Sequence, residues 1–370
     1  MTGTAGRSPS PYPWPVVTLV RRRLAALAVA VLALAGCTSP PSSSWRPGAA
    51  ASSSPAPPSR ATSPDITLEF AGDVHFETRV APLLNDPATT FGPIASTLSD
   101  ADLTMVNLET AITSRGTEQP KQYHFHTTPT ALDALRSAGI DVVTLANNHV
   151  LDYGQVGLAD TLAAVRAAKF PYTGIGNNAT EAWTPYLTTI KGRKIAILGV
   201  SQVDELQSTW VATANRPGEA HSIDLTRTLA AVRAAKKQAD LVLVFMHWGT
   251  EGNGCPNSAQ KSLAPKLAAA GADIIIGAHA HTLQGSGWLG RTFVAYGMAN
   301  FLWWENSYST ETGILRLTLH PDAPLTAQFL PAIVSQTGQP VLATGADKDR
   351  IATRYASLRA CAGLAAAPSG

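Results

Sequence analysis

What this 370-residue chain lacks limits both its location and its partners. No acidic residue occurs before Asp65, and the apolar run at 24–35 has only 12 residues. A helix that spans a bilayer needs ~20 apolar residues, which argues against a permanent transmembrane helix. Only three cysteines are present, Cys37, Cys255 and Cys361, so the chain can form at most one internal disulfide.

Residues 1–36 have the order of a secretory signal peptide. Three arginines at 21–23 precede the apolar run, and small residues follow it. The tetrad Leu-Ala-Gly-Cys at 34–37 resembles a bacterial lipobox, which would make Cys37 the lipidated first residue of the mature protein. We therefore predict a lipid anchor on the extracytoplasmic face of the cell membrane. The alternative is an ordinary signal peptide in which Cys37 has no role.

Residues 37–64 are nearly all serine, proline and alanine, a composition that favours a flexible tether. Residues 65–370 are long enough for one large α/β domain. The first 64 residues hold six of the 28 Lys and Arg side chains and none of the 26 acidic ones, so the remainder has a net charge of −4. This charge gives no electrostatic case for binding nucleic acid.

Strand-like and helix-like stretches alternate over the first two thirds of residues 65–370, and strands follow one another after that. Strands are expected at 66–71, 103–106, 142–146, 186–190, 194–200, 241–246, 274–276, 292–296, 313–319 and 327–334. Helices are expected at 91–98, 129–138, 156–169, 225–237, 260–270 and 343–358. This order predicts a single α/β domain with mixed sheets and helices outside them.

Six short polar clusters each follow an apolar run, and four of them contain histidine. They lie at 72–75, 107–109, 147–149, 247–251, 279–281 and 300–301. Open α/β sheets place their chemistry at the carboxyl ends of strands, and imidazole with oxygen donors suits a borderline divalent ion. Each cluster alone has an ordinary explanation as a turn or a hydrogen-bonded core histidine. Together they predict one metal site.

Spacing within the clusters suggests individual ligands. Asp73 and His75 point the same way in extended backbone, and His279 and His281 repeat that spacing. A carboxylate at Glu109 can bridge two ions and lower their repulsion. The predicted ligands are Asp73, His75, Glu109, Asn148, His247, His279 and His281.

Other polar residues are expected to support the site. Asp152 follows His149 closely enough to orient its ring by a hydrogen bond. Substrate-contacting or supporting positions are predicted at Asn107, Asn147, Glu251, Gln284 and Asn300. Outside the cytoplasm Cys255 and Cys361 can oxidise, and we predict a disulfide between them. The alternative is that Cys255, close to Glu251, is a free thiol or a ligand at the rim of the site.

The motifs together resemble those of the CapA family of poly-γ-glutamate capsule synthesis proteins. In order over about residues 66–305 they are Gly-Asp, Asn-Leu-Glu, Asn-Asn-His with Asp-x-Gly, His-Trp-Gly-x-Glu, Gly-x-His-x-His-x-x-Gln and Asn-Phe. That family resembles calcineurin-like metallophosphoesterases, which implies a metallophosphatase-like two-sheet sandwich flanked by helices (αββα) over residues 65–370. One departure is Asn107-Leu108-Glu109, where the superfamily has a Gly-Asp pair for its bridging carboxylate.

The resemblance also implies roles. Asp73, His75 and His281 would hold one divalent ion. Asn148, His247 and His279 would hold a second, with Mn, Fe, Zn or Mg as the metal. His149 would donate a proton to the leaving group, with Asp152 as the other catalytic residue.

Two functions from different classes are compatible with these features. The first is a membrane-anchored, metal-dependent hydrolase that uses metal-activated water on a phosphoester or a capsule-like poly-γ-glutamate polymer. The alternative is a non-catalytic, metal-dependent component of capsule or polyglutamate synthesis or export that binds the polyanion. Both imply an anionic substrate or polymer and partners in capsule synthesis or export. A purely structural lipoprotein with core histidines is a third possibility.

Overall fold

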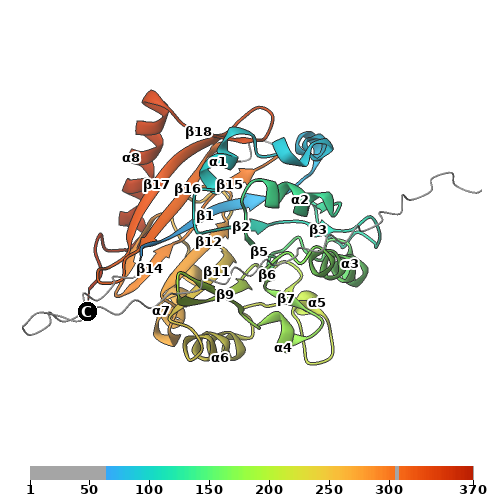
Figure 1. The fold of residues 1–370 in the computed structure, drawn as a ribbon. Coiled ribbons are helices and arrows are strands. Elements are labelled where there is room, and N and C mark those ends of the chain that lie inside the picture. The colour runs from blue at the N-terminus through green and yellow to red at the C-terminus, as the bar shows by residue number, and fades with distance from the viewer. Residues whose placement is uncertain (1–63, 305–307, 370) are drawn as a thin grey trace, which may run out of the picture. The chain divides into compact units, whose positions relative to one another are not determined.

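The computed structural model describes residues 64–304 and 308–369 (Figure 1). The predicted signal peptide, Cys37 and nearly all of the predicted tether lie outside these residues. Residues 60–370 cluster as one unit. Of the helices in the described ranges, none is both long and apolar enough to cross a membrane.

The larger of two main sheets has eight strands in the order β18-β17-β16-β1-β2-β5-β6, with β15 paired to β1 (Figure 1). Their bounds are β1 (Ile66–Val74), β2 (Leu103–Leu108), β5 (Val142–Thr144), β6 (Tyr172–Thr173), β15 (Asn300–Leu302), β16 (Glu311–Leu319), β17 (Thr326–Val334) and β18 (Pro340–Leu342). Strand β1 runs parallel to β2 and β15 and antiparallel to β16. The sheet is therefore mixed, as predicted.

The smaller main sheet has six strands in the order β13-β14-β12-β11-β9-β8. Their bounds are β8 (Tyr186–Ile190), β9 (Arg193–Ser201), β11 (Leu241–Trp248), β12 (Ile274–His279), β13 (Ser286–Leu289) and β14 (Thr292–Ala295). Strands β9, β11, β12 and β14 are mutually parallel, and β8 forms the predicted hairpin with β9. Two short pairs lie apart from the main sheets, β3 (Ala111–Ile112) with β4 (His126–Thr127) and β7 (Ile175–Gly176) with β10 (Gly218–Glu219).

Alternating side chains explain how the layers stack, because successive residues of a strand face opposite sides of its sheet. Phe70 of β1 and Phe245 of β11 share one buried cluster with residues of both sheets, which forms the core between them. Val106 of β2 belongs to a second cluster with Leu132 and Leu162 from helices beside the larger sheet. The third cluster joins neighbouring residues of β11 to two helices beside the smaller sheet.

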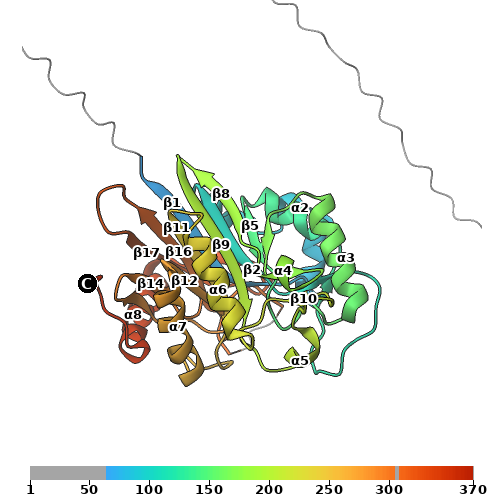
Figure 2. The same cartoon turned by 90° about the horizontal axis from the view of Figure 1, so that it is seen from below.

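Helices therefore cover the outer face of each sheet (Figure 2). The helices are α1 (Ala95–Leu98), α2 (Thr130–Ser137), α3 (Gly154–Ala167), α4 (Ala179–Ala182), α5 (Gln207–Trp210), α6 (Leu225–Lys236), α7 (Ser258–Ala270) and α8 (Gly345–Ala362). Three 3-10 segments, η1 (Thr78–Asn85), η2 (Pro87–Thr89) and η3 (Gly92–Ile94), follow β1. The predicted α/β class and the helix–sheet–sheet–helix order are confirmed.

The predicted helix at 91–98 is wrong in its first half. Gly92 has a φ of 61°, outside the right-handed helical region, and only residues 95–98 form an α-turn. The predicted strands also omit β3, β4, β6, β7, β10, β13, β15 and β18. Each of these strands has only two to four residues, too few to show a period in the sequence.

Strand register brings the polar clusters to one edge of the sandwich. Asp73 at the end of β1 lies opposite Asn107 of β2 and Asn300 of β15. Close backbone packing holds this arrangement, because a Cβ at Gly72 would lie 1.7 Å from the carbonyl oxygen of Ala299. Only glycine fits there without moving the backbone that carries Asp73.

Candidate metal centre

Among the residues that the structure describes, three groups of side chains place possible ligand atoms within 4.8 Å of one another. They are Glu109 with His247 and His279, Asp73 with Glu109 and His281, and Glu251 with His279 and His281. Glu109 belongs to two of the groups, as a bridging carboxylate would. Residues far apart in the chain and from both main sheets therefore meet here, as the sequence predicts for a metal site.

The buried carboxylate of Glu109 tests whether these residues fit a cation. Its Oε1 has no hydrogen-bond partner in the part of the chain that the structure describes. That atom lies 3.6 Å from His247 Nε2 and 3.7 Å from His149 Nε2. Burial, followed by the neighbouring Asp73 carboxylate, raises the pKa of Glu109 well above its usual range. A buried carboxylate without a partner is costly, and a bound cation removes that cost.

The histidines of these groups favour the neutral, metal-binding form. Burial, with His281 beside it, lowers the pKa of His279 to about 3, and burial likewise lowers that of His247. His279 Nδ1 is a buried atom that lacks a partner among the described residues. Neutral imidazole is the form that ligates metals. The donor set therefore fits a divalent metal ion.

Asn148 lies directly beside the first group. Its side-chain Oδ1 is 2.8 Å from His247 Nε2, and its Nδ2 donates to Glu205 Oε2 at 3.2 Å. The amide oxygen of Asn148 thus lies beside His247 Nε2, the same atom that is 3.6 Å from Glu109 Oε1. This position is compatible with the predicted role of Asn148 as a neutral oxygen ligand.

Of the predicted histidine and carboxylate ligands, His75 alone lies outside the three groups found among the described residues. Its ring nitrogens face backbone amides, with Glu77 N at 3.0 Å from Nδ1 and Trp304 N at 3.2 Å from Nε2. The ring stacks on Phe125 at 4.5 Å and meets the Trp303 ring edge-on at 4.2 Å. Burial lowers the pKa of His75 well below its usual range. His75 is thus a neutral ring that packs against Phe125 and Trp303.

A chain of amides holds the carboxylates in place. Asn107 Nδ2 lies 2.8 Å from Asp73 Oδ1 and 3.3 Å from Glu109 Oε2, and Asn147 Nδ2 donates to Asn107 Oδ1 at 3.0 Å. Asn300 Oδ1 lies 2.7 Å from His281 Nδ1. Asn107 and Asn300 therefore contact candidate ligands, and Asn147 contacts Asn107, which is compatible with the supporting role predicted for them.

His281 differs electrostatically from the other ring nitrogens in the site. Burial opposes its charge, but the Asp73 carboxylate, 3.5 Å from Nδ1, raises the pKa of His281. His279 and His281 also have φ values of 88° and 51°, which L-residues seldom adopt. Backbone strain of this kind costs on the order of 1–3 kcal/mol per residue and clusters at functional sites.

His149 and Asp152 form the predicted pair. His149 Nδ1 lies 2.6 Å from Asp152 Oδ2, which leaves Nε2 facing Glu109. Burial raises the pKa of Asp152 to about 7 even though the cation of Lys121 opposes that shift. Burial, with Lys121, lowers the pKa of His149 well below its usual range. Both shifts favour the uncharged forms of the two groups.

Sequence reasoning missed Lys121. Its side chain is only 2% exposed, and Nζ lies 3.0 Å from Asp152 Oδ1 and 2.9 Å from Glu205 Oε2. Nζ also donates to the backbone oxygen of Asn148. The residue stands in a loop without periodicity or motif, so nothing in the sequence marks it as buried.

Glu251 and Gln284 occupy different positions around the site. Glu251 is exposed, accepts a hydrogen bond from Tyr308 at 2.9 Å and reaches the group of His279 and His281. Gln284 is buried, accepts from Gln260 and donates to the backbone oxygen of Asn253 at 2.8 Å. Gln284 thus holds the 249–257 loop, which carries Glu251 to the rim.

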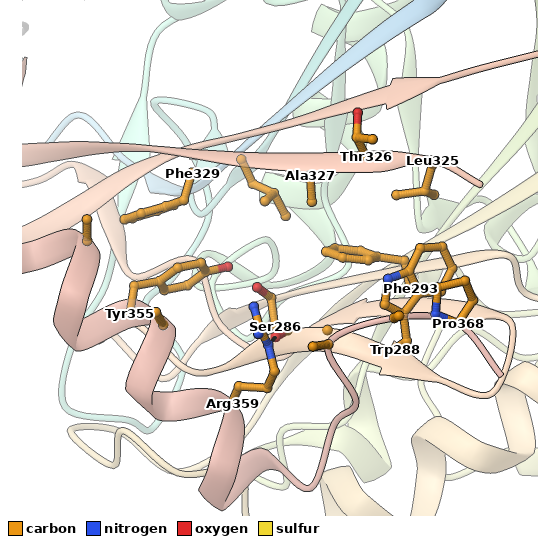
Figure 3. A pocket seen from close by; sticks show the side chains of 16 residues that line it. Ser286, Trp288, Phe293, Leu325, Thr326, Ala327, Phe329, Tyr355, Arg359 and Pro368 are labelled. Carbon is orange, nitrogen blue, oxygen red and sulfur yellow. Dashed lines mark hydrogen bonds between the residues drawn. The ribbon is translucent and has the colours of Figure 1, made fainter. Parts of the chain in front are cut away.

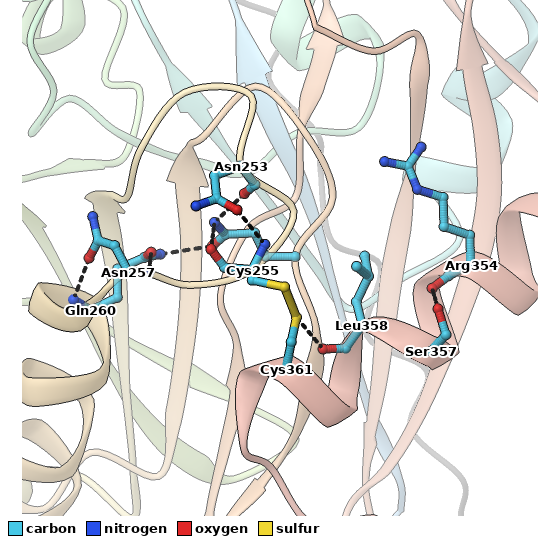
Figure 4. The surroundings of a disulfide bond; sticks show 9 residues. Asn253, Cys255, Asn257, Gln260, Arg354, Ser357, Leu358 and Cys361 are labelled. Atoms are coloured by element: carbon cyan, nitrogen blue, oxygen red, sulfur yellow. Dashed lines mark hydrogen bonds between the residues drawn. A yellow bond between two sulfur atoms is a disulfide. The ribbon is translucent and has the colours of Figure 1, made fainter.

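A disulfide ties the same loop to the closing helix. The structure joins Cys255 to Cys361 of α8, residues 106 apart in the sequence (Figure 4). Cys255 is therefore neither a free thiol nor a ligand here. The crosslink closes a long stretch of chain that includes β12, which delivers His279.

We expect Cys361→Ser to lower the free energy of unfolding by about 2–4 kcal/mol, because the crosslink restricts the unfolded chain. Urea unfolding of residues 65–370 under oxidising conditions measures the change, with wild type in reductant as the control. Equal stability of wild type and variant in both conditions would show that the disulfide does not form in solution.

Known proteins resemble this chain in sequence. The family model described as "Bacterial capsule synthesis protein PGA_cap" matches residues 67–303. The chain is 28% identical over 297 residues to "Capsule biosynthesis protein CapA" of Bacillus anthracis, covering 77% of this chain and 72% of that protein. It is 28% identical over 242 residues to "PGA biosynthesis protein CapA" of Bacillus subtilis, covering 64% and 63%. A "probable polyglutamine synthesis accessory protein" of Mycobacterium tuberculosis is 32% identical over 191 residues, with 49% and 50% covered.

Solved structures also match this chain, at low sequence identity. A "novel phosphatase" of Mycoplasma pneumoniae is 14% identical, with a TM-score of 0.45 over 73% of this chain and 94% of its own. A 5'-nucleotidase of Candida albicans is 11% identical, with a TM-score of 0.40 over 80% and 58%. The sequence match is the decisive one, since the family model covers more than half of the chain. The predicted resemblance is confirmed, and the chain belongs to the PGA_cap family of bacterial capsule synthesis proteins.

Proposed function

We propose that this protein is a metal-dependent hydrolase of the cell envelope that cleaves a phosphoester or a γ-glutamyl linkage in a capsule-like polymer. The observation that carries the proposal is the buried, unpartnered Oε1 of Glu109, which faces His247 and His149. A candidate proton donor therefore lies beside a candidate metal ligand in one enclosed site.

The donor groups suggest two ions. One would be held by Glu109, His247 and His279 with the amide oxygen of Asn148, and the other by Asp73, Glu109 and His281. Mixed nitrogen and oxygen donors are compatible with Mn, Fe, Zn or Mg. When bound, such ions activate water and offset the negative charge that develops on the reacting phosphoryl or carboxyl group.

The side chains of the protein orient the proton transfer. Asp152 holds Nδ1 of His149 and so turns Nε2 toward Glu109. Asp152, whose pKa burial raises to about 7, can be protonated and donate to Nδ1, which leaves the one proton of the neutral ring on Nε2. From there Nε2 would give that proton to the departing oxygen or nitrogen. Lys121 fixes Asp152 from the opposite side and thereby fixes the ring.

The relatives' names suggest the substrate class. Two are named for capsule or PGA biosynthesis, and we propose that this chain likewise meets an anionic polymer and partners in capsule synthesis or export. The match spans between half and three quarters of those proteins, so their whole activities come to this chain only as proposals. We also propose the lipid anchor at Cys37 and a location on the extracytoplasmic face.

The test is turnover by the domain of residues 65–370 loaded with Mn²⁺. We expect release of p-nitrophenol from bis(p-nitrophenyl) phosphate or of glutamate from a γ-linked oligoglutamate. His149→Ala should lower kcat about 10²- to 10⁴-fold, the range for loss of a general acid. His320→Ala, a surface histidine beside Asp65, is the matched control and should leave kcat unchanged. Absence of turnover on both substrates by protein that retains metal would contradict the hydrolase proposal.

A non-catalytic polymer-binding role is the second candidate, and His75 favours it. Because its ring nitrogens face backbone amides, the second ion would have one ligand fewer than the phosphoesterase pattern supplies. Metal-dependent retention of intact polyglutamate, without cleavage, would support this role.

A further inference from the structure

A cavity of about 450 Å³ lies between α8, the β13–β14 hairpin and the β16–β17 hairpin (Figure 3). None of its sixteen lining residues belongs to the candidate metal groups, and none is acidic. Phe293 in its wall pairs with Ile274, at the start of β12, whereas His279 ends that strand. The cavity is therefore separate from the metal centre.

One end of the cavity is polar and cationic. Figure 3 shows the hydroxyl of Tyr355, Ser286 and the guanidinium of Arg359 grouped there. Arg359 Nε donates to the backbone oxygen of Ser286 at 2.9 Å, which fixes the guanidinium against β13. Within the described ranges no carboxylate forms an ion pair with Arg359, whereas Arg350 and Arg354 on the same helix both have carboxylate partners. Its terminal N–H groups are thus available to an anion.

Tyr355 supplies a second, independent indication of a ligand. Its side chain is 6% exposed, and its hydroxyl, although it faces Ser286, makes no hydrogen bond of acceptable geometry to any described residue. Burial raises the pKa of Tyr355 to about 12, so the hydroxyl keeps its proton and remains a donor. A buried hydroxyl without a partner costs about 1–3 kcal/mol, which a bound acceptor would recover.

The opposite end is apolar and aromatic. Trp288 and Phe293 meet edge-on at 5.5 Å, with Leu325 and Pro368 beside them (Figure 3). Phe329 stacks on the Tyr355 ring at 3.9 Å and extends this wall to the polar end. Convergent polar donors at one end of a mostly apolar cavity are typical of sites for small organic molecules.

We propose that this cavity is a second ligand site for an amphipathic organic carboxylate. The carboxylate would accept hydrogen bonds from Arg359 and Tyr355, and the hydrocarbon body would lie against Trp288 and Phe293. Charge and shape both support this class. Among the described residues Arg359 has no carboxylate partner, and the Tyr355 hydroxyl makes no hydrogen bond of acceptable geometry. The wall at the opposite end is mostly apolar, which suits a hydrocarbon body.

Calorimetric titration with decanoate, kept below its micellar concentration, tests the site on the folded domain. We expect saturable binding with one molecule per chain. Decanol has the same body without the charge, and acetate has the charge without the body, so each should bind at least tenfold more weakly. Arg359→Gln should weaken decanoate binding at least tenfold, and Tyr355→Phe about threefold or more.

Arg354→Gln is the matched control, because Arg354 is on the same helix but pairs with Glu311 at 2.6 Å and does not line the cavity. It should bind decanoate as wild type does. If Arg359→Gln does not fold, Tyr355→Phe alone decides, since it removes only one hydroxyl. Equal binding of decanol and decanoate, no saturable binding, or unchanged binding in Tyr355→Phe would overturn the proposal.

Discussion

We expect the Glu109→Gln substitution to raise the free energy of unfolding without metal and to lower it when metal is bound. Without metal the variant should be about 1–3 kcal/mol more stable than wild type, since it removes a buried carboxylate whose Oε1 has no partner among the described residues. With saturating Mn²⁺ the wild type should be the more stable protein, because the variant loses the carboxylate shared by two ligand groups. Metal affinity should fall about 100-fold or more.

The pH dependence of the metal-free protein supports the same assignment. The folded protein holds the Glu109 proton more tightly than the unfolded chain, because its pKa is raised in the folded state. Metal-free wild type should therefore gain stability as the pH falls through the folded pKa toward the ordinary pKa of a glutamate. The Gln variant should lack this gain. Urea unfolding at several pH values and elemental analysis of bound metal measure both effects.

Glu219→Gln is a matched control for this experiment. Glu219 is also a buried glutamate whose pKa burial raises, and it belongs to none of the three ligand groups of the described chain. Its substitution should change stability equally with and without metal and leave the metal content unaltered. A Glu109→Gln protein with the metal content and metal affinity of wild type would contradict the metal-centre assignment.

Lys121→Met should disable the site without touching a candidate metal ligand side chain. The substitution leaves the Asp152 carboxylate buried without its cation and should lower the free energy of unfolding by about 3 kcal/mol. The loss of Lys121 removes an influence that lowers the pKa of Asp152, so that pKa should rise above about 7. The limb of the pH–rate profile that reports ionisation of the His149–Asp152 pair should then move to higher pH. The relative fall in kcat should be larger than the relative change in KM.

Nitrogen NMR of the His149 ring distinguishes positioning from a purely structural role. If Lys121 fixes the pair, the proton distribution between Nδ1 and Nε2 of His149 should change in the variant. Lys191→Met is the control, because Lys191 makes a partly exposed ion pair with Asp102 at 2.7 Å, worth at most about 1 kcal/mol. A Lys121→Met protein with an unchanged ring signal and unchanged pH profile would contradict the positioning role.

Local chemistry was enough to predict the α/β class and the polar strand ends, whereas the two-sheet sandwich followed from the resemblance to a known family. The sequence shows the apolar run of β11 that leads to His247 and the strand of β1 that leads to Asp73. Both can be recognised because the pattern of apolar and polar residues in a strand depends only on residues close together in the chain. Parallel pairing places the ends of β1 and β2 at one edge of the larger sheet and the ends of β11 and β12 at one edge of the smaller sheet. Packing of the two sheets against each other then brings those edges together. Glu109, two residues after Asn107 at the end of β2, was a candidate for a bridging carboxylate for the same reason.

Long-range contacts decided what remained. Burial of Lys121 depends on Asp152 and Glu205 reaching it from other loops, and the orientation of the His75 ring depends on a backbone amide at Trp304, 229 residues away. The cavity beside Arg359 exists only because α8 packs across two hairpins. Local patterns report which way a residue faces within its own strand or helix. They do not report which distant groups complete its environment, and those groups set its charge, its partners and its role.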